Sequence, residues 1–163
     1  MDQQQFIEVV TRSWRAFDEA IAGLDDAALT EPGVVGDWSI KDLLGHTAAW
    51  EQQAIRHIEQ WLRDERITRV AGLEVDRFNA AEGERRRGWP LAEAREEHAA
   101  TRQRLLAAVA SLPEVAWSSV VQLESGQQTL GEIIARDLGG DGPADHAAEH
   151  ARHIAAWRAA RGL

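Results

Sequence analysis

The chain has 163 residues, a length typical of one domain, and its 44% hydrophobic and 28% charged residues are ordinary for a globular protein. Its formal net charge of −9 repels nucleic-acid phosphates, and no basic stripe offsets that repulsion, so we expect no nucleic-acid partner. The chain contains no cysteine, which excludes disulfides, thiolate metal ligands and a cysteine nucleophile.

The N-terminal residues carry neither the basic region nor the apolar run of a secretory signal. No stretch approaches the roughly 18 consecutive apolar residues of a membrane-spanning helix. We therefore expect a cytoplasmic protein with no membrane partner.

The first third of the chain predicts two helices joined by a loop. Apolar residues recur at steps of three and four over residues 3–22, which is the helical period. Residues 24–37 are rich in glycine and proline and are expected to form a loop. Ser39 is typical of a helix N-cap, with Asp42 three residues later as a capping-box partner, so a second helix is expected over residues 39–64.

The middle of the chain predicts one further long helix after an ambiguous connection. Within residues 65–89, Val75–Ala81 is expected to form a short helix or a turn. The third long helix is expected from Pro90 to Ser111. The segment Val120–Leu123 resembles a strand but is too short to build a sheet alone.

The C-terminal part predicts a short helix and a final long one. Thr129 and Glu132 have capping-box spacing and open a short helix that should end near Gly139. The final helix is expected from Pro143 to about Ala160, because proline is favoured at a first helical position.

Four long amphipathic helices without a credible sheet indicate an all-α four-helix bundle, with residues 1–163 as a single domain. The stretch between the second and third helices is long enough to cross the bundle, which allows those two helices to run parallel. No repeat or linker divides the chain.

The last helix carries three of the six histidines, His146, His150 and His153. Their spacing of three and four residues places them on one side of the helix. A His-x-x-x-His pair on an inward face offers two neutral imidazole nitrogens to one metal ion. Two ligands do not make a tight site, and His46 in the second helix is the best candidate for a third.

Short motifs in a fixed order extend from about residue 36 to residue 157. They are Trp38, Lys41–Leu44, His46, Trp50–Glu51, Asp76–Asn79, Asp145–His146, Glu149–His150, Ile154 and Trp157. In this order and spacing they resemble the DinB-like superfamily of bacterial four-helix bundle proteins. The Trp-Ser-x-Lys-Asp and His-Ala-x-x-Ile-x-x-Trp patterns look closest to its branch of colibactin self-protection proteins (ClbS/DfsB-type); thiol-dependent transferases using mycothiol or bacillithiol look more distant.

This resemblance implies an up-down-down-up bundle with a long crossover between helices 2 and 3, and a homodimer. It also implies a divalent metal held by His46, His146 and His150. Three histidines leave a position for water or substrate, and both zinc and nickel suit such nitrogen ligands. His153 could replace His146 as the partner of His150, because residues three apart are also neighbours.

The two remaining histidines have structural interpretations. His57 follows His46 by eleven residues, which is about 16 Å along a helix, so it cannot share the ion and is expected to be a packing or surface residue. His98 lies on the apolar side of its helix and is expected to be a core histidine.

Residues near the histidines offer further candidates. Glu149 is a secondary candidate for a general base, but its position about 100° around the helix favours a solvated glutamate. Glu51 could hydrogen-bond to a metal ligand. Trp50 and Trp157 are core residues that could also wall a pocket near the ion. The run Glu84–Arg87 reads as a solvated face.

Three functions are compatible with these features. The first is a metal-dependent enzyme that acts on a small electrophilic or toxic molecule, either by transfer of a low-molecular-weight thiol (bacillithiol, mycothiol or glutathione) or by hydrolysis. The second is a resistance protein that sequesters a small molecule without turnover. The third is a dimeric bundle whose metal is purely structural.

Overall fold

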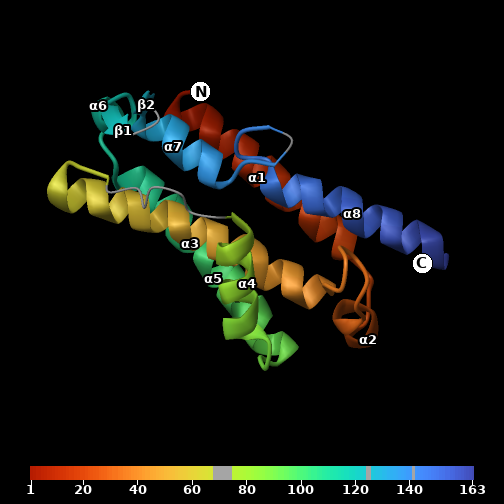
Figure 1. The fold of residues 1–163 in the computed structure, drawn as a ribbon. Coiled ribbons are helices and arrows are strands. Elements are labelled where there is room, and N and C mark those ends of the chain that lie inside the picture. The colour runs from red at the N-terminus through yellow and green to blue at the C-terminus, as the bar shows by residue number, and fades with distance from the viewer. Residues whose placement is uncertain (68–74, 124–125, 141) are drawn as a thin grey trace.

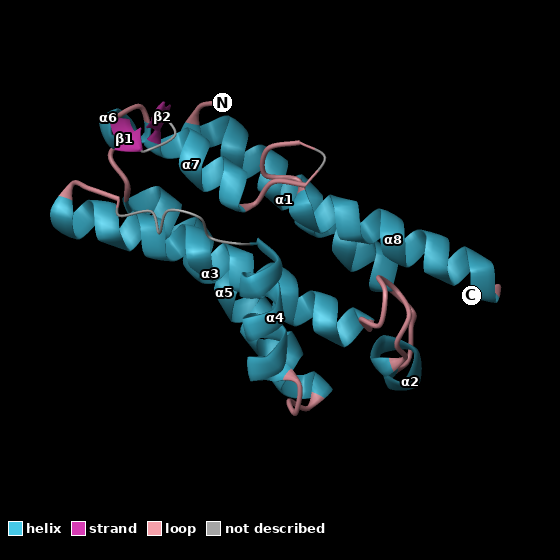
Figure 2. Ribbon diagram, viewed as in Figure 1, coloured by secondary structure: helices cyan, strands magenta, loops and turns pink. Residues whose placement is uncertain are grey.

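A computed structural model describes residues 1–67, 75–123, 126–140 and 142–163, and these residues are mainly helical (Figures 1 and 2). The four long helices are α1 (Gln3–Ile21), α3 (Ile40–Asp64), α5 (Leu91–Ser111) and α8 (His146–Arg161). The shorter helices are α2 (Asp26–Thr30), α4 (Val75–Arg86), α6 (Glu114–Trp117) and α7 (Leu130–Asp137). Over the described residues, no helix combines the length and apolar character that a bilayer crossing needs.

The long helices pack mainly as two pairs, α1 with α8 and α3 with α5, which lie side by side in Figure 1. The predicted apolar stripe of α1 is buried between the pairs, with Phe6 and Phe17 fully enclosed. Burial of such side chains contributes about 1.5–3 kcal/mol each. Contacts between α3 and α8 join the two pairs. They place α3, which carries His46, against α8, which carries the other three candidate histidines.

The start of α3 is fixed by the predicted capping box. The backbone N–H of Asp42 donates to Oγ of Ser39 at 3.2 Å, and the backbone N–H of Ser39 donates to Oδ2 of Asp42 at 2.8 Å. Both bonds satisfy amides that the helix itself leaves without partners. The cap therefore sets the register of α3, and with it the direction of His46 in the second turn.

The expectation of a bundle without a sheet is wrong. Strand β1 (Val120–Leu123) pairs in antiparallel register with β2 (Gly126–Thr129), so the fold is mainly helical with one small hairpin. Val121 and Leu123 are buried, which supplies the packing that an isolated hairpin lacks. The partner strand has the sequence Gly-Gln-Gln-Thr, whose polar residues carry no alternating pattern.

Two other boundaries differ from the expectations. The predicted loop over residues 24–37 contains α2, whose N-cap Asp25 accepts from the backbone N–H of Ala28. Helix α8 begins at His146 and not at Pro143, because Ala144 has a left-handed backbone with φ of 63°. The backbone N–H of Ala144 donates to the carbonyl of Ala135, which ties the approach to α8 down onto α7.

The crossover between α3 and α5 contains α4, which packs against α3. The sequence predicted a short helix or turn over Val75–Ala81, and the helix extends to Arg86. Residues 68–74 of the crossover lie outside the described residues. Residues of α4 line the same cavity as His46.

Candidate metal centre

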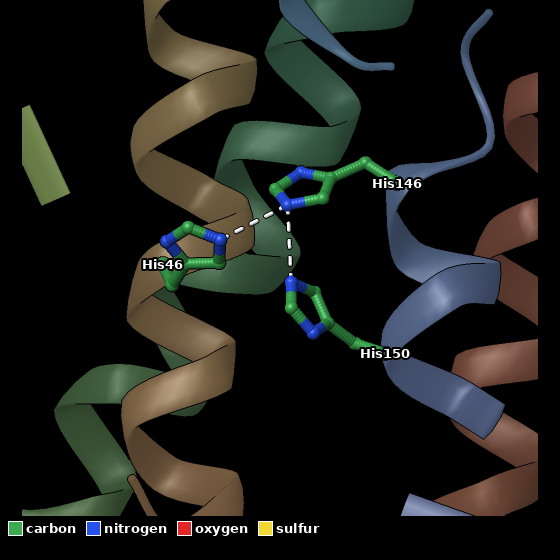
Figure 3. A group of neighbouring side chains, drawn as sticks. All are labelled: His46, His146 and His150. Carbon is green, nitrogen blue, oxygen red and sulfur yellow. Dashed lines mark hydrogen bonds between the residues drawn. The ribbon is translucent and has the colours of Figure 1, made fainter. Parts of the chain in front are cut away.

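Three histidine side chains from two helices converge on one point (Figure 3). His46 comes from α3, His146 is the first residue of α8, and His150 lies one turn later. The Nε2 atoms of His46 and His146 are 2.9 Å apart, and those of His146 and His150 are 3.0 Å apart. One ring nitrogen from each of the three residues lies within 4.8 Å of the other two, which is close enough for all three to bind one metal ion.

The donor set fits a divalent metal ion. The ring nitrogens of a tetrahedral zinc site are about 3.3 Å apart, because each Zn–N bond is about 2.0–2.1 Å. The Nε2 of His146 lies within hydrogen-bond distance of two other ring nitrogens, although a neutral imidazole nitrogen is either a donor or an acceptor. One cation accepts a lone pair from all three rings and removes this conflict.

Burial keeps the three rings neutral. It lowers the pKa of His46 to about 2, with further lowering by the neighbouring His146 and His150. It also lowers the pKa of His150 to about 3 and that of His146 to about 4. Metal binding needs the deprotonated ring, so the fold provides the ligands in their binding form.

Two tryptophans surround the cluster. The ring of Trp38 lies 4.8 Å from that of His46, and the ring of Trp50 lies edge-on to His146 with the centroids 6.5 Å apart. These apolar rings limit the access of water to the nitrogens from those sides, which strengthens electrostatic interactions at the centre.

The family model of the DinB superfamily matches residues 10–136. The chain belongs to the DinB superfamily. The matched region contains His46, whereas His146 and His150 lie beyond it. A comparison with curated proteins finds no match.

Solved structures share the fold of this DinB protein. A crystal structure of a mycothiol-dependent maleylpyruvate isomerase aligns with a TM-score of 0.70 at 15% identity, and the alignment covers 94% of this chain and 61% of the isomerase chain. This chain thus spans less than two thirds of the isomerase. An uncharacterised protein from Escherichia coli UTI89 aligns with a TM-score of 0.78 at 7% identity, covering 99% of this chain and 95% of the other.

A cavity of about 490 Å³ lies between α3, α4 and the start of α5, next to the histidine cluster. His46 and Trp38 form part of its wall, and Asn79 of α4 lines it as well. His46 thus belongs to the histidine cluster and also lines the cavity, whereas His146 and His150 are not part of the cavity lining.

The far wall of the cavity contains a buried arginine that the sequence analysis missed. The run Glu84–Arg87 read as a solvated face, but Arg86 is only 6% exposed. Its guanidinium pairs with the carboxylates of Glu82 and Glu97, each at 2.6 Å. These pairs raise its pKa against the effect of burial. The spacing of four residues between Glu82 and Arg86 was the signal available in the sequence.

Glu51 lies close behind the cluster. It lines a small internal chamber of about 10 Å³ together with His146, and the indole of Trp14 donates to its Oε1 at 2.7 Å. Its Oε2 has no hydrogen-bond partner among the described residues. The carboxyl group of Glu51 and the ring of His146 thus line the same small chamber, and a hydrogen bond from Glu51 to a metal ligand stays a prediction.

The secondary candidates lie around the cluster but not in it. Nδ1 of His153 is 3.4 Å from Nδ1 of His150, on the side of that ring opposite to the converging Nε2 atoms. A Cβ atom placed on Gly140 would lie 2.5 Å from Oε2 of Glu149. The Glu149 carboxylate therefore packs against Gly140 and points toward the loop before α8. Trp157 is two turns beyond His150, is 4% exposed, and lies beneath the guanidinium of Arg161.

The remaining histidines lie away from the cluster. Nδ1 of His57 is 2.5 Å from Oδ2 of Asp137, and both side chains are buried. His98 is buried against the ring of Phe17, and its Nε2 has no hydrogen-bond partner in the described part of the chain. Both are residues of the core.

Proposed function

We propose that this DinB protein is an enzyme in which His46, His146 and His150 hold one zinc or nickel ion and which acts on a small electrophilic or toxic molecule. The observation that carries the proposal is the convergence of three neutral Nε2 atoms beside a cavity of molecular size. When bound, such an ion supplies a Lewis acid that polarises an electrophilic group and favours the deprotonated form of a thiol or of water.

Thiol transfer is the reaction that the comparisons favour over hydrolysis. The isomerase that shares the fold is mycothiol-dependent, and this chain has no cysteine of its own. A low-molecular-weight thiol such as mycothiol, bacillithiol or glutathione would then be the co-substrate. The residues of the chain would hold the ion, shield it with Trp38 and Trp50, and position the electrophile in the cavity.

The finer features expected from the sequence belong to the same proposal. They are the up-down-down-up order of the four long helices, a homodimer, a cytoplasmic location, and a kinship with the colibactin self-protection branch. The cavity of about 490 Å³ offers room for a reactive small molecule of the kind that this branch would act on. Glu149 is not part of the proposed chemistry, because its carboxylate lies over Gly140.

Sequestration without turnover is the second candidate, and the cavity of about 490 Å³ favours it. A structural metal is the third, because the three ligands join α3 to α8. Unfolding of the protein on metal removal would support this third function. If the metal is catalytic, we expect the metal-free protein to keep its helices.

The test is metal-dependent turnover. Protein loaded with zinc or nickel is assayed for transfer of each thiol to an aromatic halide and for hydrolysis of an activated ester. We expect activity with one thiol, its loss on chelation, and its loss in His46→Ala, while His98→Gln controls for removal of a histidine elsewhere. Tight binding of an electrophile with no turnover in any of these assays would favour sequestration instead.

A further inference from the structure

A hydrogen bond between α3 and α4 fixes the orientation of one amide in the cavity wall. The indole Nε1 of Trp50 lies 3.0 Å from Oδ1 of Asn79. An indole nitrogen only donates, so the amide oxygen of Asn79 must face Trp50 and the NH2 group must face the other way. This NH2 group donates to no acceptor within the residues that the structure describes, and its side chain lines the cavity beside His46.

Two of the three cationic side chains in the lining, Arg86 and Arg87, are ion-paired, and the third, Lys41, is hydrogen-bonded to a backbone carbonyl. Nζ of Lys41 donates to the carbonyl of Trp89 at 3.2 Å. Arg86 is held by Glu82 and Glu97, and Arg87 pairs with Glu84. The lining holds four carboxylates, those of Asp37, Asp42, Glu82 and Glu84, against these three cations, so its net negative charge opposes the binding of a ligand carboxylate.

Two of the carboxylates in the wall are occupied by these arginines, and a third, Asp42, caps α3. Asp37 is the exposed acid of the lining and belongs to its outer part. A cationic ligand thus finds no buried carboxylate that is free to receive it in the described lining. The NH2 group of Asn79 is a neutral donor in this lining and has no acceptor among the described residues.

We infer that the cavity binds a neutral molecule through a carbonyl-type oxygen that accepts from the Asn79 amide, with a flat apolar part against Trp38. The Trp38 ring borders the same cavity and contacts His46, so such a ligand would lie next to the histidine cluster. Such a ligand would be the substrate of the proposed enzyme. Its binding is independent of that proposal, and only its conversion after binding rests on the proposed function.

Three probes of similar size separate the ligand classes. Acetophenone is a neutral acceptor, benzoate is an anionic acceptor, and benzylammonium is a cationic donor. Binding is measured on metal-free protein and repeated in His150→Ala, so that the result does not depend on metal loading or on catalysis. The indole N–H signal of Trp50, assigned with Trp50→Phe, reports binding in a nitrogen-15 NMR titration.

Asn79→Asp is the decisive variant. It keeps the oxygen that accepts from Trp50 and converts the free donor into a charged acceptor. Ala81→Asp adds the same charge to α4 at an exposed position that does not line the cavity and serves as the matched control. Thermal unfolding of all variants checks that α4 remains folded.

We expect acetophenone to bind the parent best and to shift the Trp50 indole signal. In Asn79→Asp its affinity should fall about tenfold, and benzylammonium should become the preferred probe, whereas Ala81→Asp should keep the parental order. Stronger binding of benzoate in the parent, an unchanged order in Asn79→Asp, or no indole shift with any probe at millimolar concentration would overturn the inference. Metal content is measured independently, so failure here leaves the histidine site standing.

Discussion

The indole Nε1 of Trp14 donates a 2.7 Å hydrogen bond to Oε1 of Glu51 between α1 and α3. Glu51 is only 2% exposed, and its nearest cation is Arg102, whose Nε lies 4.0 Å from Oε1. Desolvation outweighs both interactions and raises the pKa of Glu51 to about 8. The native protein therefore holds a proton on this carboxyl group at neutral pH.

The first prediction concerns the stability of the metal-free protein above neutral pH. An unfolded glutamate releases its proton near pH 4.5, so the native state binds more protons between about pH 4.5 and about pH 8. The contribution of Glu51 to stability must then fall as pH rises through this range. Glu51→Gln should remove this fall and leave the variant more stable than the parent at pH 8, by a few kcal/mol or less.

Urea unfolding at several pH values measures the effect, and Glu59→Gln, an exposed change on the same helix, is the control. A parent whose stability is constant from about pH 5 to about pH 8 would contradict the assigned proton.

The second prediction concerns metal retention in acid. The pKa values of His46, His146 and His150 are lowered by burial to about 4 or below, so protons compete with the metal only in that range while the protein stays folded. Free histidine titrates near pH 6.5. We expect zinc to remain bound after dialysis at pH 5, where a flexible hexahistidine peptide releases it. Loss of zinc with a midpoint near pH 6.5 would show that the rings are solvated.

The same lowered pKa values imply a loss of stability in acid. The unfolded rings bind protons below pH 6.5 and the native rings do not, so the stability that these residues contribute is complete above that pH and is lost progressively as the pH falls toward about 2, the lowest of the three native pKa values. The metal-free parent should therefore be most stable in the middle of the pH range.

The third prediction concerns the contact between α3 and α4. A Cβ atom on Gly45 would lie 2.5 Å from Cδ of Arg86, and that side chain cannot move freely because Glu82 and Glu97 hold its guanidinium. Gly45→Ala should destabilise the protein by about 1–3 kcal/mol through overpacking. It should also weaken ligand binding in the cavity that Arg86 lines.

Gly83→Ala on α4 is the matched control. A Cβ atom there meets nothing within 4 Å, so the change should stabilise the helix by about 0.5–1 kcal/mol. Denaturant unfolding compares the two variants. Equal effects of both alanines would refute the close contact at Gly45.

The sequence was sufficient to predict the helices that carry the histidines, and the reasons are local. The Ser39–Asp42 cap was predicted and is present, so the direction of His46 followed from helical spacing. The spacing of His146 and His150 placed them on one side of α8 in the same way. Their approach to His46 could not follow from spacing, because it depends on how α8 packs against α3.

The features that the sequence did not predict depend on distant contacts. The left-handed backbone of Ala144 is held by a hydrogen bond to Ala135, and no local signal marks it. The strand Gly126–Thr129 has a polar sequence and forms because β1 pairs with it. The burial of Arg86 depends on Glu97, which lies on another helix.

The fourth prediction separates the structural histidine from the metal ligands. His57 and Asp137 are both buried and pair at 2.5 Å, so His57→Gln leaves the carboxylate without its imidazole partner. This change should cost about 2–4 kcal/mol of unfolding free energy. Metal content should stay at the parental value. A loss of metal without a loss of stability would contradict the structural role of His57 and would indicate a role in metal binding.

The most direct test of the metal centre is the metal content of untagged protein, measured for the parent and for His150→Ala by elemental analysis after incubation with zinc or nickel. We expect about one ion per chain in the parent, and its loss in the variant while the helical circular dichroism is unchanged. A parent that binds no ion under these conditions, or a variant that keeps it, would contradict the three-histidine site.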